Sequence, residues 1–244
     1  MQGRQDIMNT LGFSSKIAGH LLAIFLLTLT TLPILAQGKK SRVDLNQIFS
    51  HMDGSAKHLR TLSADLEYTK VTVLVNDFST ESGQMYFRNA KSPDILIDFK
   101  KPAPKVILFR KDKAEIYQPM INQIQEFDLR NHSGLIQKFL LLGFGTNSRE
   151  LKKVYQVKYL KEEQLGGEAT ALLELTPREE NLAAQLSKIQ LWISEESWLP
   201  IQQKFFEASG DYSIARYSSV KVNRSLPTSK FQIHTTKGAK RVKM

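Results

Sequence analysis

Two histidines are the first residues in this sequence whose spacing could do chemistry. His51 and His58 are seven positions apart, so in a helix they lie on the same side. A metal site in a protein takes at least three ligands, and no third histidine, cysteine or carboxylate is spaced to join this pair. Histidines on a surface helix commonly face solvent, and we predict no metal site.

Paired carboxylates could act as general acid and base. The pairs Glu162-Glu163, Glu179-Glu180 and Glu195-Glu196 all lie in segments that read as turns, so we expect them to be solvated. The chain has no cysteine and no GxSxG, P-loop, HExxH or dinucleotide-binding motif. We therefore predict a protein that is not an enzyme and has no cofactor.

The amino terminus has the order of a secretory signal. Arg4 and Lys16 precede an apolar run at Leu21–Leu35, and Ala36 then opens a polar stretch. The run is shorter than the roughly 20 apolar residues of a membrane-spanning helix, so we expect cleavage. Met8 is an equally good start, and the exact cleavage bond stays open.

We accordingly predict that residues 1–36 are a signal peptide and that residues 37–244 form a single domain. Without cysteine, neither a disulfide nor a lipid on cysteine is expected, which favours a soluble monomer in the periplasm. The net charge of +10 favours anionic partners. An exported protein rarely meets nucleic acid, so a transient anionic membrane surface is the expected partner of this kind.

Short segments with apolar residues at every second position dominate the rest of the chain. This alternation is typical of half-buried strands, and strands joined by short turns pair antiparallel. The first group of predicted strands is Leu62–Val75, Gly83–Arg88, Asp94–Lys100, Lys105–Arg110, Ala114–Gln118 and Gln123–Leu129. The second group is Tyr155–Leu160, Ala169–Leu175, Ser187–Ile193, Ile201–Glu207, Asp211–Val222 and Lys230–His234.

Two local features accompany these strands. The apolar phase changes within Leu62–Val75, which predicts a bulge near Thr69-Lys70. Basic residues gather at the carboxyl terminus, and we predict that this tail is frayed and solvated, with weak attraction to anionic headgroups as the alternative. The residues of that basic cluster are Lys237, Lys240, Arg241 and Lys243.

Three short helices are predicted from apolar periodicity and capping residues. The first spans Asp44–Leu59. The second has its body at Leu135–Leu142 and is apolar nearly all round, so it must be covered on two sides or cover something apolar itself. The third begins at Asn147 or Ser148 and runs to about Tyr155.

The fold class that these elements predict is mainly β (α+β). Sheets seldom exceed about 10 strands without curling, and too few helices remain to cover a flat sheet. We therefore predict an incomplete antiparallel β-barrel of about 11–12 strands, with the three helices as a lid over an apolar interior.

The order of several short motifs resembles the outer-membrane lipoprotein carrier family, the LolA-like proteins. The motifs are Thr61–Leu66, Gly83–Phe87, Ser92–Asp94, Lys111–Lys113 ahead of Ile116–Pro119, Leu140–Gly145, Leu173–Pro177, Leu191–Ile193 and Trp198–Pro200. The resemblance covers nearly all of residues 37–244. It implies an incomplete barrel whose cavity shields lipoprotein acyl chains between the inner and outer membranes.

The resemblance also implies partners and a ligand-binding surface. The implied partners are acylated lipoproteins, an inner-membrane ABC transporter complex and an outer-membrane acceptor. On the sheet side, the predicted ligand-binding residues are Met85, Phe87, Ile95, Ile97, Phe99 and Phe109. On the lid side, they are Ile48, Met52, Phe139, Leu140 and Leu142.

Three questions stay open at this point. Tyr86, Leu96 and Leu108 are apolar on the opposite phase, so alternation alone does not decide which strand face points inward. Ser92 stands where the family usually has an arginine that contacts the lid, which puts that control of the lid in doubt. Alternative functions are a carrier of another lipid or glycolipid, an envelope-stress sensor domain that binds a lipidated or protein ligand, and a periplasmic hydrolase.

Overall fold

The computed structural model describes residues 44–90, 93–129 and 142–244. They belong to one compact unit, Arg42–Met244. The predicted signal peptide, Ser92 and most of the predicted helix at Leu135–Leu142 lie outside the described residues. In the part of the chain that is described, no helix is long and apolar enough to cross a membrane.

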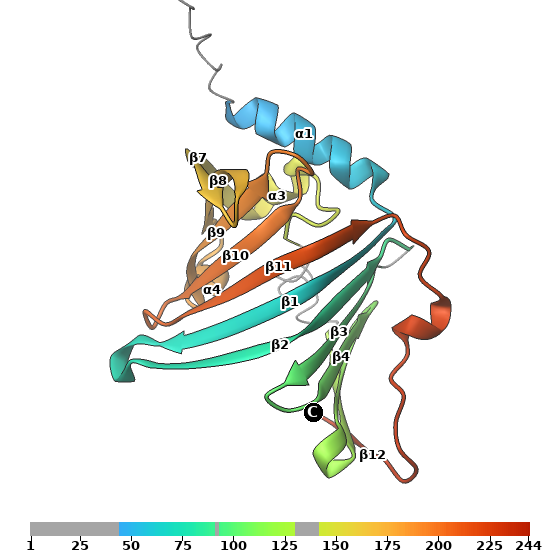
Figure 1. Cartoon of the computed structure of the whole chain (residues 1–244). Helices are drawn as coiled ribbons and strands as arrows, with labels where there is room; N and C mark the ends of the chain where they lie inside the picture. Colours follow the sequence, from blue (N-terminus) through green and yellow to red (C-terminus); the bar gives the residue numbers. More distant parts are fainter. Residues whose placement is uncertain (1–43, 91–92, 130–141) are drawn as a thin grey trace, which may run out of the picture. The chain divides into compact units, whose positions relative to one another are not determined.

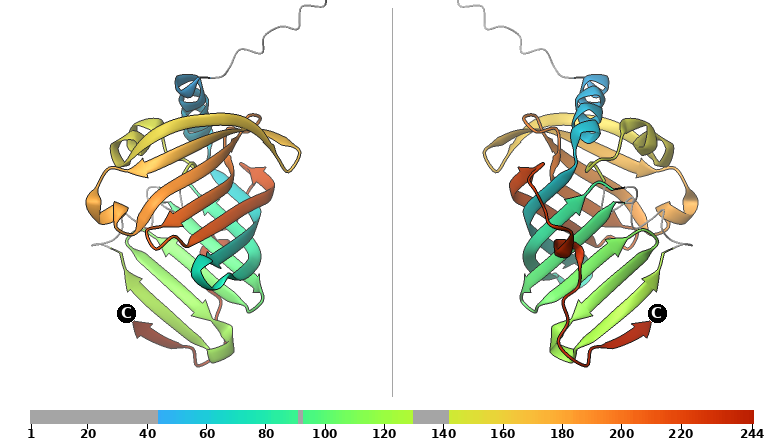
Figure 2. Two further views of the ribbon diagram at one scale, coloured as in Figure 1. Left: turned by 90° about the vertical axis from the view of Figure 1, so that its left-hand side faces the viewer. Right: turned by 90° about the vertical axis from the view of Figure 1, so that its right-hand side faces the viewer.

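A single open sheet of 12 strands forms the body of this unit, in the order β12-β6-β5-β4-β3-β2-β1-β11-β10-β9-β8-β7. It curls about its apolar face (Figures 1 and 2), so the predicted mainly β, incomplete barrel is confirmed. The strands are β1 (Thr61–Thr72), β2 (Asp77–Arg88), β3 (Asp94–Lys101), β4 (Lys105–Arg110), β5 (Lys113–Gln118), β6 (Gln123–Asp128), β7 (Tyr155–Leu165), β8 (Glu168–Pro177), β9 (Leu186–Ser194), β10 (Pro200–Glu207), β11 (Tyr212–Val222) and β12 (Lys240–Lys243).

Neighbouring strands pair antiparallel, except that β12 runs parallel to β6. The first six strands form a meander, and β11 returns to pair with β1 along Leu62–Val71. Turns therefore alternate between two ends of the sheet. The β1–β2, β3–β4 and β5–β6 turns all lie at one end, which we call the hairpin end.

Capping residues fix where the helices begin. In α1 (Leu45–His58), Asp44 Oδ1 accepts the Gln47 N–H at 2.8 Å and Gln47 Oε1 accepts the Asp44 N–H at 3.0 Å, a reciprocal capping box. In α3 (Ser148–Val154), Asn147 Oδ1 accepts the Glu150 N–H at 2.9 Å. Both helices match the prediction, and α4 (Glu180–Ala183) is an additional short turn of helix.

The two faces of the sheet carry separate apolar clusters. On the concave face, a first cluster lies between α1 and strands β7–β9 and includes Ile48, Met52 and Leu173. A second concave cluster includes Met85, Phe87, Ile95 and Ile97 from β2 and β3. Met85 and the residues on the same face of these strands therefore point toward the concave side of the sheet.

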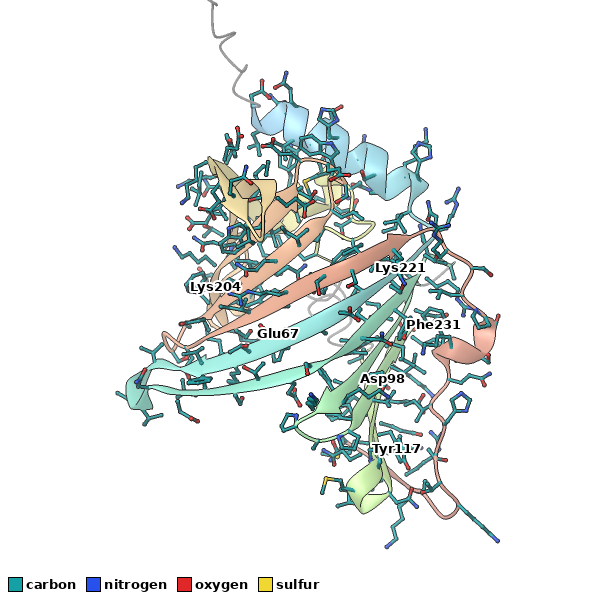
Figure 3. The ribbon with its side chains drawn as sticks, in the orientation of Figure 1. Glu67, Asp98, Tyr117, Lys204, Lys221 and Phe231 are labelled. Carbon is teal, nitrogen blue, oxygen red and sulfur yellow. The ribbon has the colours of Figure 1, made fainter. Side chains whose placement is uncertain are left out.

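On the convex face, Tyr86, Leu96 and Leu108 pack against Phe231. Phe231 belongs to a carboxyl-terminal segment that crosses the outside of the sheet (Figure 3). Its ring is fully buried, the Arg88 guanidinium carbon lies 4.6 Å from the ring centroid, and Arg110 donates to its carbonyl oxygen. The apolar residues on the convex face are therefore covered by this carboxyl-terminal segment.

The prediction of a strand at Lys230–His234 was wrong. Thr228–Phe231 forms a 3-10 turn, η3, and no strand follows before β12. The apolar residues Phe231 and Ile233 alternate because they pack down onto β3 and β4, and not because they belong to a sheet.

The prediction of a frayed basic tail was also wrong. Lys240–Lys243 forms β12 and pairs with β6. Arg241 makes ion pairs with Glu115 and Glu126, which raise the pKa of its guanidinium. Neighbouring carboxylates on β5 and β6 thus hold part of the basic cluster in place.

The predicted bulge at Thr69-Lys70 was wrong as well. β1 pairs with β2 in unbroken register from Thr61 to Thr72, and its irregularity lies at Ser63/Asp65 against β11. Val71 lies on the other face of β1 while still paired with Phe78, and Val73–Val75 lies beyond the strand in a 3-10 turn, η1, at the hairpin tip, so the change of apolar phase needs no extra residue. A second such turn, η2 (Pro119–Ile121), joins β5 to β6.

Candidate functional site

An apolar cavity lies on the concave face, between β1–β4 on one side and β9–β11 on the other. Its volume is about 380 Å³, at the lower end of the range that small-molecule sites occupy. Each lining strand contributes alternate residues, because only one phase faces inward. The apolar lining comprises Leu66, Met85, Ile97, Phe99, Ile107, Phe109, Leu186, Phe205 and Ala215.

The cavity brings together four of the residues predicted from the sequence: Met85, Ile97, Phe99 and Phe109. Phe87 and Ile95 belong to the same concave cluster but do not line the cavity. Ile48, Met52 and Leu142 lie in the other concave cluster, under α1, where they pack against the sheet. Phe139 and Leu140 lie outside the described residues.

Two buried polar side chains form the floor of the cavity. Gln203 is 1% exposed; its Nε2 donates to the Leu142 carbonyl oxygen at 2.5 Å, and its Oε1 accepts from the Tyr217 hydroxyl at 2.9 Å. Burial raises the pKa of Tyr217 well above its usual value. The floor is therefore polar but uncharged, and both groups are used internally.

Charged residues surround the mouth. Lys105 Nζ donates to both carboxylate oxygens of Glu81, at 2.6 and 2.8 Å, and lies 4.8 Å from the centroid of the Phe99 ring. Glu207, also in the lining, is 3.9 Å from Lys70. The cavity thus runs from a charged, partly exposed mouth to an apolar interior.

Polar contacts hold α1 to the rest of the unit. Asp53 accepts from the Ser148 backbone N–H at 2.6 Å and from its hydroxyl at 2.7 Å, joining α1 to the start of α3. Ser55 donates to the Ser197 carbonyl oxygen at 2.9 Å, and His51 stacks on Trp198 with 4.2 Å between ring centroids. His51 therefore has a packing partner at the surface.

The groups considered for catalysis do not come together at this cavity. Glu162-Glu163 lies within β7 and not in a turn, because β7 continues to Leu165. Glu163 accepts from Trp192 Nε1, and its pKa is lowered, first by the hydrogen bond from Lys161. Among the described residues, no cluster of three His, Cys, Asp or Glu side chains could hold a metal ion.

Sequence reasoning missed the polar floor and the β9–β11 wall. Gln203 and Tyr217 lie on the same strand phase as Phe205 and Ala215, so the alternation of β10 and β11 carried a signal for them. Sequence reasoning did not use that signal, because glutamine is a residue type that lies mostly on protein surfaces. Its burial depends on partners that come from distant parts of the chain.

Comparisons with known proteins show that the fold of this chain is similar to that of solved structures. A family profile described as an uncharacterized protein matches residues 144–234, and no curated protein matches the chain. An uncharacterized conserved protein from Thermus thermophilus has a TM-score of 0.53 at 11% identity, covering 82% of this chain and 98% of the other. The chain shares its fold with that structure.

Two further solved structures are similar at lower TM-scores. A putative outer-membrane lipoprotein-sorting protein domain from Vibrio parahaemolyticus has a TM-score of 0.44 and 15% identity, covering 76% of this chain and 94% of the other. The MucA/MucB complex of Pseudomonas aeruginosa has a TM-score of 0.46 and 11% identity, covering 77% of this chain and 60% of the other.

Proposed function

We propose that this protein is a periplasmic LolA-like carrier that shields the acyl chains of lipoproteins and moves them from the inner to the outer membrane. The observation that carries the proposal is the cavity on the concave face, with apolar walls and an uncharged floor. Each acyl methylene removed from water contributes about 0.8 kcal/mol, so such walls suit an acyl chain.

The gradient from mouth to floor supports this choice of ligand. An acyl chain would lie against Met85, Ile97 and Phe99, while the polar part of the cargo would remain at the Glu81–Lys105 ion pair. Because the hydrogen bonds of Gln203 and Tyr217 are already used by each other and by the backbone, the floor offers few polar contacts to a ligand. A ligand held mainly by burial is also one that a partner with another apolar surface can remove.

Neighbouring residues on β4 provide a matched test. Ile107 lines the cavity, whereas Val106 points to the opposite face and packs on the convex cluster. Both are partly buried. Titration with a fluorescent triacylated lipopeptide should show that Ile107→Gln weakens binding by about tenfold, because a buried amide without partners costs about 1–3 kcal/mol.

The Val106→Gln variant is the control and should bind the lipopeptide as the unmodified protein does. Equal binding by both variants, or no binding by the unmodified protein, would contradict the carrier proposal. Native mass spectrometry of protein from its own periplasm then identifies the natural ligand. A free glycolipid would indicate transport of another lipid, and a protein partner without lipid would indicate the sensor alternative.

A further inference from the structure

The strongest exposed apolar feature of the described residues is the tip of the β1–β2 hairpin. The exposed fractions are 52% for Val73, 93% for Leu74, 67% for Val75 and 72% for Phe78; we call these four residues the apolar tip. Scattered exposed apolar residues are ordinary on protein surfaces, but a contiguous group of large ones marks an interaction site.

The apolar tip is built as an ordered turn. The Asn76 N–H donates to the Val73 carbonyl oxygen at 3.2 Å, and the Val73 N–H donates to Asp211 Oδ1 at 2.9 Å, which ties the tip to the β10–β11 turn. β1 and β2 stay paired as far as Thr72 and Asp77. The fold therefore presents these side chains to solvent in a defined position.

The tip lies at the same end of the sheet as the mouth of the cavity. Tyr68 and Glu81, which are paired across β1 and β2, belong to the cavity lining, and the last pair of the hairpin lies four residues further on. At about 3.3 Å per residue, the tip extends roughly 13 Å beyond this pair. Figure 1 shows the hairpin reaching past the neighbouring strands.

A second turn at the hairpin end has the same character. In η2, Met120 is 78% exposed and Ile121 is 61% exposed. Basic side chains stand near this end. Lys70 and Lys100 have 52% and 63% of their side-chain surface exposed and are paired with Glu207 at 3.9 Å and Asp98 at 2.8 Å, and Lys101 beside Lys100 is exposed. Apolar residues with basic neighbours suit the boundary between acyl chains and anionic headgroups.

We propose that the apolar tip docks on the surface of an anionic lipid bilayer, which brings the cavity mouth to the headgroup level. A convex tip suits a fluid surface that closes around it, whereas a protein partner would need a fitting pocket. Interfacial segments bury their apolar side by about 5–10 Å. A tip that extends roughly 13 Å beyond the Tyr68/Glu81 pair would thus reach the acyl region and leave the mouth close to the headgroups. The purpose of this docking rests on the proposed carrier function. The docking itself does not, because membrane contact is measured separately from ligand uptake.

The test is co-sedimentation of the exported and processed protein with vesicles of phosphatidylethanolamine and phosphatidylglycerol. Leu74→Asp combined with Phe78→Ser should lower the vesicle partition coefficient at least about tenfold, because two apolar side chains leave the interface. Leu160→Asp is the matched control, since Leu160 is an exposed apolar residue, 43% exposed, on the edge strand β7. It should partition as the unmodified protein does.

Lipopeptide titration in solution separates the two proposals. The tip variant should take up lipopeptide normally, which shows that it is folded. Normal vesicle partition of the tip variant, or an equal loss in Leu160→Asp, would overturn bilayer docking. A tip variant that binds vesicles normally but fails to transfer cargo to an acceptor would overturn it as well, in favour of a protein contact. Failure of lipopeptide uptake by every variant, with a partition loss confined to the tip variant, would contradict the carrier function and leave the docking surface standing.

Discussion

The two halves of the concave face begin from the same strand pattern but end differently. Between α1 and β7–β9, the apolar side chains of Ile48, Leu173 and Leu191 are fully buried against one another. Between β1–β4 and β9–β11, side chains of similar size surround a cavity of about 380 Å³. We call these the filled half and the hollow half.

The difference lies in what covers each half, and not in the strands themselves. The apolar face of α1 brings Ile48, Phe49 and Met52 down onto the filled half. No residue of α1 lines the cavity in the hollow half. Period-two alternation makes a face apolar, but a second element is needed to fill the space above it. Where the described elements leave that space open, the same pattern surrounds a cavity.

The filled half should respond most strongly to truncation. Leu173 is 0% exposed within the cluster under α1, so Leu173→Ala should lower the free energy of unfolding by about 2–5 kcal/mol. Chemical denaturation measures this loss. Leu160→Ala, at an exposed position of the adjacent strand β7, should change it by no more than about 0.5 kcal/mol. Similar losses in the two variants would mean that the filled half is not tightly packed.

The bend of β2 around the hollow half should be nearly as sensitive. A Cβ added at Gly83 would lie 2.1 Å from the Asp98 carbonyl oxygen on β3, at the point where the β2–β3 register shifts. Backbone must move to relieve such a contact, so Gly83→Ala should destabilise the protein by about 1–3 kcal/mol.

Gly54 provides the matched control for Gly83. Its added Cβ would meet nothing within 4 Å, and alanine is favoured over glycine in a helix by up to about 1 kcal/mol. Gly54→Ala should therefore raise the melting temperature while Gly83→Ala lowers it. If both variants melted alike, the close approach of β2 and β3 would not be important for stability.

Truncation in the hollow half should cost much less. Ile107 lines the cavity and is only partly buried, so Ile107→Ala removes few packed neighbours. The expected loss is no more than about 1 kcal/mol, with weaker binding of the triacylated lipopeptide as the larger effect. A loss as large as that of Leu173→Ala would show that the hollow half is packed core, which would contradict the comparison of the two halves.

Sequence reasoning identified the strands because burial of one face makes apolar and polar residues alternate along the sequence. The resemblance to the LolA-like family placed Met85, Ile97, Phe99 and Phe109 on one predicted ligand-binding surface, and these four residues line the cavity. Sequence reasoning could not choose the inward phase, because Phe231 covers Tyr86, Leu96 and Leu108 from far along the chain. The local sequence pattern does not show which distant segment covers a given face of the strands.

The carboxyl terminus shows the same limit in two ways. Phe231 and Ile233 alternate as a strand would, although they lie flat on the convex face. In β12 all four residues are exposed, so no alternation marks it as a strand. Its pairing with β6 and the ion pairs of Arg241 with Glu115 and Glu126 join residues more than 100 positions apart.

The smallest predicted effect concerns pH and the outer surface of the filled half. Glu174, next to Leu173, accepts from Lys188 Nζ at 2.8 Å, and this hydrogen bond is the main cause that lowers the pKa of its carboxyl below the usual 4.5. Its stabilising contribution is therefore present above that value and is lost as pH falls through the folded pKa. Glu174→Gln should lower the free energy of unfolding by about 0.5 kcal/mol at neutral pH, and by less as the solution is acidified.

Denaturation of both proteins across pH 3–7, a range of about four units around the usual carboxyl pKa, measures this difference. In a Lys188→Met background, Glu174→Gln should show a much smaller pH-dependent difference, because the main partner of the carboxylate is gone. A difference that persists unchanged in that background would assign the effect to the other groups that lower this pKa, namely Gln190, which donates to Glu174 at 3.3 Å, and the charge of Lys158. The Glu174–Lys188 ion pair would then add nothing to the stability of the filled half.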